Sequence, residues 1–312
     1  MRVSLLPLIL AAAIAAGQPV LAQAPAAPPA AADAYPRPAP DTRPLQYGRF
    51  TVEVVGKGPD VILIPGLNSS RETFKALVEA EKGHYRFHLI QIAGFAGTPA
   101  GDNASGEVVA PTVEAIDQYI RDNRLKAPVV IGHSLGGEAA LMLAARHPGD
   151  VGKVMAVDSL PFLGALFGAP APTDQLKGMA DKIAAGMAGS DDAGWQKGAI
   201  ANTAPLVSEG PDRDMAIGWG LASDRRVSAQ AFKDLILTDL RPELGQITAP
   251  VTVLYAFGPQ MGGQSTAQVD GFIGGLYANL KGARLIRVDD SRHFIMFDQP
   301  ARFQAEVEAF LK

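Results

Sequence analysis

The pentapeptide Gly132-His133-Ser134-Leu135-Gly136 has the G-x-S-x-G pattern and is flanked by two contrasting apolar segments. A β-branched run, 129–131, precedes it, and an Ala- and Leu-rich stretch, 137–145, follows it. The first run predicts a buried strand and the second a helix, so Ser134 falls on a sharp strand-to-helix turn. A hydroxyl presented there, at a helix N-terminus that favours developing negative charge, is typical of a catalytic nucleophile. We therefore expect Ser134 to be a nucleophile, and not a residue that only caps the helix.

The N-terminal residues indicate export. Arg2 supplies a positive charge, residues 3–17 are almost wholly apolar, and small residues before Gln23 or Pro25 suit cleavage. We expect residues 1–22 to be a secretory signal peptide, with cleavage after Ala22, and the mature protein to be periplasmic or secreted. Residues 23–44, rich in Ala and Pro, are expected to be a semi-rigid linker. No later apolar stretch is long enough to span a bilayer, so no stable membrane insertion is expected after signal removal.

Composition narrows the function classes. The chain has no cysteine, which excludes disulfides, a thiol nucleophile and cysteine metal ligands within it. Its net charge of −4, without a Lys/Arg cluster, argues against a nucleic-acid partner. We expect a small-molecule substrate and no metal or cofactor; the sequence leaves the oligomeric state open.

Strand-like and helix-like segments alternate along the chain, which predicts a mostly parallel sheet with right-handed crossovers. The expected strands are 50–55, 61–64, 85–92, 129–131, 153–158, 251–256 and 283–288, the first two joined as a hairpin through Gly56-Lys57-Gly58-Pro59. The expected helices include 110–123 and 300–311. Between 161 and 245 the strand pattern stops and helix-like stretches such as 173–187 and 228–238 take its place. We expect a core of residues 45–160 and 246–312 with 161–245 inserted as a helical cap.

A serine nucleophile needs a base, and five histidines are available. His84 and His88 lie at or in a strand, His147 lies at a helix end, and His133 is expected to point away from Ser134. His293 lies in the loop just past the last expected strand. Ligands of open α/β sheets bind beyond the carboxyl ends of the strands, so this loop and the Ser134 turn share one edge. His293 is therefore the expected base.

The acid that orients the base is expected to be Asp158. It ends the strand that follows the Ser134 helix, on the same edge of the sheet. The loop after 251–256, Phe257 to Gly263, contains no carboxylate. Asp270 is more consistent with a helix residue, and Asp289 and Asp290 with a solvated pair.

Acyl transfer also needs backbone donors for the oxyanion. The Leu135 N–H, directly after Ser134, is one candidate. The other is expected from the loop Pro65-Gly66-Leu67-Asn68, which follows the strand 61–64. We assign it to the Leu67 N–H.

Taken in order, Pro65-Gly66, Gly94-Phe95-Ala96-Gly97, the Ser134 pentapeptide, Asp158, a helical insertion and His293 resemble the α/β-hydrolase superfamily from about residue 50 onward. The resemblance implies an α/β fold with a mostly parallel, about eight-stranded sheet, an inserted helical cap and a Ser-acid-His triad. The chain departs from the family pattern at Gly258-Pro259, where the acid after strand seven is usual, and at Pro65, where the oxyanion loop usually has His. The resemblance therefore implies that the acid is Asp158, at the position that follows strand six of the family fold.

The resemblance implies hydrolysis of an ester, thioester or amide. We expect a carboxylesterase that works through an acyl-enzyme, with Phe162, Phe167, Trp195 and Trp219 in or near the cap suiting an apolar group. Two alternatives stay open. A proline-type aminopeptidase would share the triad and need a carboxylate for the substrate amine, for which Asp191, Asp192, Asp212 and Asp214 are candidates. A non-catalytic binding or signalling protein would keep the fold without turnover.

Overall fold

The computed structural model describes residues 34–39 and 41–312. The predicted signal peptide, residues 1–22, and the first part of the predicted linker, up to residue 33, lie outside the described residues. Within the described ranges, no helix is both long and apolar enough to cross a membrane.

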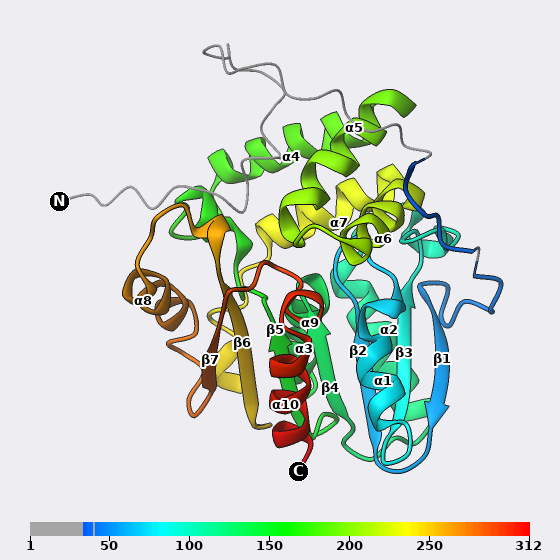
Figure 1. Ribbon diagram of the computed structural model, residues 1–312, viewed down its shortest axis with the longest axis vertical. Helices are drawn as coiled ribbons and strands as arrows, with labels where there is room; N and C mark the ends of the chain where they lie inside the picture. The colour runs from blue at the N-terminus through cyan, green and yellow to red at the C-terminus, as the bar shows by residue number, and fades with distance from the viewer. Residues whose placement is uncertain (1–33, 40) are drawn as a thin grey trace.

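A seven-stranded sheet forms the centre of the described chain, in the order β1-β3-β2-β4-β5-β6-β7 (Figure 1). The strands are β1 (Phe50–Gly56), β2 (Asp60–Ile64), β3 (Arg86–Ile92), β4 (Val129–His133), β5 (Lys153–Val157), β6 (Val251–Phe257) and β7 (Arg284–Asp289). All pairings from β3 to β7 are parallel, and β1 pairs antiparallel with β3. The mostly parallel α/β sheet predicted from the sequence is confirmed, with seven strands where the resemblance implied about eight.

The predicted hairpin between the first two strands is wrong. β1 pairs with β3 along its whole length, Phe50 with Ile92 through Gly56 with Arg86, and β2 lies between β3 and β4. The physical reason is burial. Residues 61–64 of β2 are fully buried, as a strand covered on both faces must be. β1 is exposed along part of its length, which suits an edge position.

Helices cover both faces of the sheet. They are α1 (Lys75–Glu81), α2 (Val109–Asp122), α3 (Leu135–Arg146), α8 (Thr266–Leu276), α9 (Ile295–Asp298) and α10 (Pro300–Leu311). Alternate residues of each strand enter different cores: Ile62 and Ile64 pack with α2 and α3, whereas Val61 and Leu63 pack with α1 and α10. This alternation of side chains buries both faces of the sheet beneath helices.

In the sequence, four helices come between β5 and β6. They cover the edge of the sheet where the parallel strands end (Figure 1). They are α4 (Asp174–Ala188), α5 (Asp192–Thr203), α6 (Pro211–Ala222) and α7 (Arg225–Leu237). Side chains cap three of these helices: Thr173 caps α4, Asp191 caps α5 and Asp224 caps α7. α4 and α7 correspond to the helical stretches expected from the sequence, whereas α5 and α6 are not predicted as separate helices.

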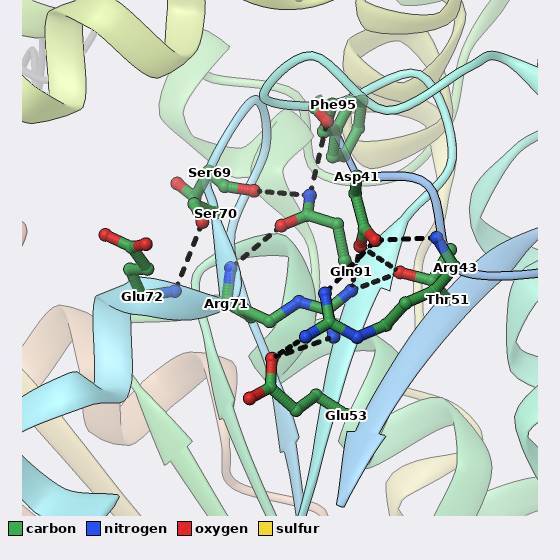
Figure 2. A network of polar contacts seen from close by, with 10 residues as sticks. All are labelled: Asp41, Arg43, Thr51, Glu53, Ser69, Ser70, Arg71, Glu72, Gln91 and Phe95. Atoms are coloured by element: carbon green, nitrogen blue, oxygen red, sulfur yellow. Dashed lines mark hydrogen bonds and ion pairs between the residues drawn. The ribbon is translucent and has the colours of Figure 1, made fainter. Parts of the chain in front are cut away.

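The described part of the predicted linker is docked onto the fold. Asp41 accepts hydrogen bonds from Thr51 of β1 and from the buried guanidinium of Arg71, as Figure 2 shows. Closer to the N-terminus, the Pro36 carbonyl lies where a Cβ on Gly218 of α6 would be, so the segment passes directly against that helix. The described part of this segment therefore contacts α6 through Pro36 and the core through the polar contacts of Asp41.

Candidate active site

Ser134 occupies a strained turn between β4 and α3. Its backbone angles are φ 54° and ψ −119°, a region that side chains rarely adopt. The turn is tight because a Cβ on Gly132 would lie 1.9 Å from the Gly136 carbonyl oxygen, and one on Gly136 would lie 2.0 Å from that of Ile64. Both glycines of the pentapeptide are therefore needed for the chain to pass, and the turn presents Ser134 at the carboxyl edge of the sheet.

Asp158 and His293 are brought together at the same edge. His293 Nδ1 lies 2.7 Å from Asp158 Oδ2, and the Ala256 N–H donates to Asp158 Oδ1 at 2.8 Å. Asp158 also has a positive φ, 45°, and its own N–H donates to the Leu254 carbonyl at 2.7 Å. Both side chains are mostly buried. The carboxylate is thus held by β6 on one side and oriented toward the imidazole on the other.

Of the other histidines, His88 and His147 contact groups outside the site, whereas His133 packs against His293. His88 is buried between Tyr119 and Asp60, and His147 contacts carboxylates of α2. His133 is fully buried, and its Nε2 lies 3.1 Å from the His293 carbonyl oxygen. Burial and the nearby His293 lower the pKa of His133 well below the ordinary value, which keeps its ring neutral beneath the His293 loop.

The alternative acids contact groups other than His293. Asp270 accepts from Tyr255 and from Arg287, and Asp289 pairs with the same arginine. Asp270 lies in α8 and Asp289 is mostly exposed, as expected from the sequence.

The two candidate oxyanion donors lie on either side of Ser134. Leu135 is the first residue of α3, and Leu67 lies in the loop after β2. A Cβ on the neighbouring Gly66 would lie 3.1 Å from Ser134 Cβ, so this loop passes close to the serine. Neither Leu67 N–H nor Leu135 N–H donates to another described residue. Both are therefore available to a bound oxygen.

A cavity of about 750 Å³ joins these groups. Ser134, Asp158, His293, Leu67 and Leu135 all line it. Most of the other lining side chains are apolar and come from the helices between β5 and β6 and from α8, among them Leu163, Met179, Ile183, Trp195, Phe232 and Ile273. The cavity can enclose an apolar group beside the serine.

The expected aromatic lining is only partly correct. Trp195 lines the cavity, whereas Phe162 is buried in a separate cluster with Leu176 and Ile236. Phe167 packs against that same cluster, and Trp219 packs against Phe297. The sequence does not indicate which of these aromatic side chains line the cavity. Each helix between β5 and β6 has one side that faces the cavity and another that packs against its neighbours.

Glu138 is a lining residue that sequence reasoning missed. It lies one turn into α3 from Ser134 and is 1% exposed. Burial, together with the charge of Asp234, raises the pKa of its carboxyl well above the ordinary value. A single acid within an Ala/Leu-rich helix that follows Ser134 was the available signal.

One cluster away from the cavity has ligand atoms suited to a metal. Asp117, His147 and Asp150 offer ligand atoms within 4.8 Å of one another. The Arg121 guanidinium pairs with Asp117, so a positive charge already occupies this cluster. None of these residues lines the cavity.

Comparison with known proteins identifies the family to which this chain belongs. A family model described as the alpha/beta hydrolase family matches residues 61–306. The chain is 27% identical over 259 residues to a pimeloyl-(acyl-carrier protein) methyl ester esterase of Aromatoleum aromaticum, which covers 78% of this chain and 94% of that protein. It is 29% identical over 110 residues to the protein of the same name from Vibrio vulnificus. That match covers 35% of this chain and spans 40% of the relative's length.

Solved structures share the fold at low sequence identity. A hydrolase from Pseudomonas aeruginosa aligns with a TM-score of 0.70 at 18% identity, over 86% of this chain and 96% of that one. An esterase from Exiguobacterium antarcticum aligns with a TM-score of 0.68 at 19% identity, over 84% and 95%.

Proposed function

We propose that this chain, which belongs to the alpha/beta hydrolase family, is an exported serine hydrolase that cleaves a carboxylic ester through an acyl-enzyme. Hydrolysis of the esterase type is what the family and its relatives support. The serine nucleophile, the triad and export are our own assignments. Thioesters and amides react through the same steps and belong to the proposed substrate range.

In the proposed mechanism His293 is the base. Its Nε2 takes the proton of Ser134 while Oγ attacks the substrate carbonyl carbon, and the carbonyl oxygen becomes an oxyanion. The N–H groups of Leu67 and Leu135 donate to that oxyanion. When the tetrahedral species collapses, His293 returns the proton to the leaving alcohol, and the acyl group stays on Ser134. Water, deprotonated by the same imidazole, then releases the acid and restores the serine.

Asp158 has a positioning role in this scheme. By accepting from His293 Nδ1–H, its carboxylate holds the imidazole in the tautomer that leaves Nε2 free, and it stabilises the imidazolium that forms during attack. The 2.7 Å contact between Asp158 and His293, at the sheet edge where Ser134 is presented, is the observation that carries the proposal.

The substrate is proposed to carry an apolar group. The cavity beside Ser134 is lined mainly by apolar side chains, and relatives are named as esterases of a methyl ester. The aminopeptidase alternative has less support, because Asp191, Asp192, Asp212 and Asp214 do not line the cavity. Asp191 and Asp192 are engaged elsewhere, as the cap of α5 and in a pair with Arg225.

A fluorophosphonate probe tests the nucleophile. We expect one covalent adduct per chain by intact-protein mass spectrometry, located on Ser134, and none in Ser134→Ala.

A second experiment compares turnover of p-nitrophenyl esters of varied chain length with turnover of aminoacyl anilides. Turnover of the esters, lost in Ser134→Ala, supports the esterase. Absence of an adduct and of turnover supports the non-catalytic alternative.

Export has its own test. The chain is expressed in a bacterial host, and the N-terminus of the protein is read from the periplasmic fraction. A chain that begins at Gln23 supports cleavage after Ala22, whereas an intact Met1 on soluble protein opposes the signal assignment.

A further inference from the structure

Glu138 is a buried acid that the proposed mechanism does not use. Its side chain lines the cavity that contains Ser134, yet its Oε1 atom has no hydrogen-bond partner. An unpaired buried polar group destabilises the folded state, and more so if it is charged. A native structure that carries such a group within its cavity calls for a functional explanation.

The position of Glu138 is fixed relative to the reacting atoms. It lies four residues after Ser134 on α3, which corresponds to a rise of about 6 Å along the helix. From Leu135 to Ala145, α3 is otherwise built from small and apolar residues, and every residue in that range is buried. The carboxyl is therefore held at a set depth beside the nucleophile by a rigid element.

The surroundings of Glu138 supply no cation to pair with it. Asp234 of α7 is its strongest charged neighbour and carries the same sign, while Arg146, two turns further along α3, pairs with Glu243. Tyr277 also lies near, but its hydroxyl donates to the Ser159 carbonyl. Because burial raises the pKa of Glu138, its neutral form is favoured, and a neutral carboxyl both donates and accepts hydrogen bonds.

We propose that Glu138 is the specificity-determining residue of this cavity, where it hydrogen-bonds an uncharged polar group of the substrate, such as an amide or a second carbonyl. This inference rests on the proposed function, since it names a further feature of the substrate that Ser134 attacks. The substrate then has an apolar chain with one polar group a few bonds from the scissile carbonyl. A purely aliphatic ester of the same length leaves the Glu138 carboxyl unpaired.

Two esters of matched length test the assignment: p-nitrophenyl 4-acetamidobutyrate, which carries an amide, and p-nitrophenyl heptanoate, which does not. In the wild type we expect the larger kcat/KM for the amide ester. Glu138→Leu is expected to lower kcat/KM for the amide ester by about tenfold, the factor that one lost hydrogen bond gives, and to leave heptanoate unchanged or faster. Glu138→Gln, which can still donate and accept, should keep the preference. If Glu138→Leu changes both esters alike, or neither, the assignment is wrong.

Binding separates this inference from the proposed function. In the Ser134→Ala background, isothermal titration gives Kd for both esters with and without Glu138→Leu. A tenfold weakening confined to the amide ester supports Glu138 even if the wild type shows no turnover, in which case the esterase proposal alone fails. Equal Kd values with and without Glu138→Leu overturn the role of Glu138. Should Glu138→Leu not fold, Glu138→Met makes the same comparison with a more flexible apolar side chain.

Discussion

The backbone N–H of Ala256 donates to Asp158 Oδ1 at 2.8 Å, so β6 holds a carboxylate that belongs to the end of β5. The loop after β6 has Gly258 and Pro259 and supplies no acid of its own. With one oxygen held in this way, the other is directed at His293. The neighbouring strand therefore contributes to the site through its main chain.

Gly136→Ala should disrupt the turn that holds Ser134. The added Cβ would lie 2.0 Å from the Ile64 carbonyl oxygen, which is backbone and can move only if β2 moves. We expect a loss of ester turnover and a Tm lowered by several degrees, measured by calorimetry. Gly178→Ala in α4, which has open space around it, is the matched control and should be neutral or slightly stabilising. A Gly136→Ala protein with normal Tm and turnover would contradict the close approach of β2 and α3.

Asp41→Asn should loosen the docking of the N-terminal segment. Burial raises the pKa of Asp41, but hydrogen bonds from Thr51 and the Arg43 N–H, and the charge of Arg71, outweigh it, so the net shift is downward. The stability that this carboxylate contributes is therefore present at neutral pH and is lost as pH falls through its lowered pKa. We expect a loss of about 2 kcal/mol near neutrality.

Urea unfolding at several pH values checks this prediction. The difference between Asp41→Asn and the wild type should shrink below about pH 4, as the pH falls from the unfolded-state pKa through the lowered pKa of the folded Asp41 carboxyl. Glu79→Gln removes the exposed pair with Lys82 and serves as the control, with a change below about 0.5 kcal/mol. A difference that does not vary with pH would mean that the charge of Asp41 is not what matters.

Glu138→Gln should change how stability varies with pH. The folded state keeps the Glu138 proton to a higher pH than the unfolded state does, because its pKa is raised by burial. Between the two pKa values the unfolded state is therefore favoured progressively as pH rises. We expect the Tm of Glu138→Gln, relative to the wild type, to increase as pH rises above the ordinary glutamate pKa of about 4.3. A constant offset over that range would show that Glu138 titrates alike in both states.

Much of this architecture was predictable from local pattern. The bounds of α10 and β6 follow from apolar runs and from Pro300 at the first helical turn, and Gly132-His133-Ser134-Leu135-Gly136 identified the turn that the structure has. The pairing of β1 with β3 could not be predicted in this way. β1 and β2 are consecutive in the sequence, and their residues do not indicate that β3, which comes later in the chain, lies between them in the sheet.

The residues of the candidate site were also predictable only in part. Asp158 and His293 could be assigned to one sheet edge because parallel strands end together, and they lie in contact. Which side chains of the four helices line the cavity depends on how those helices pack on each other, so the position of Trp219 against Phe297 could not be predicted from the sequence.

The most direct test of the triad is kcat for Asp158→Asn on a p-nitrophenyl ester. Asparagine keeps the shape of the side chain but favours the wrong imidazole tautomer, so kcat should fall by about four orders of magnitude. Asp289→Asn, at the exposed end of β7, should stay close to the wild type. If Asp158→Asn retains most of the wild-type kcat, Asp158 is not the acid that orients His293, and the proposed Ser134-His293-Asp158 mechanism is contradicted.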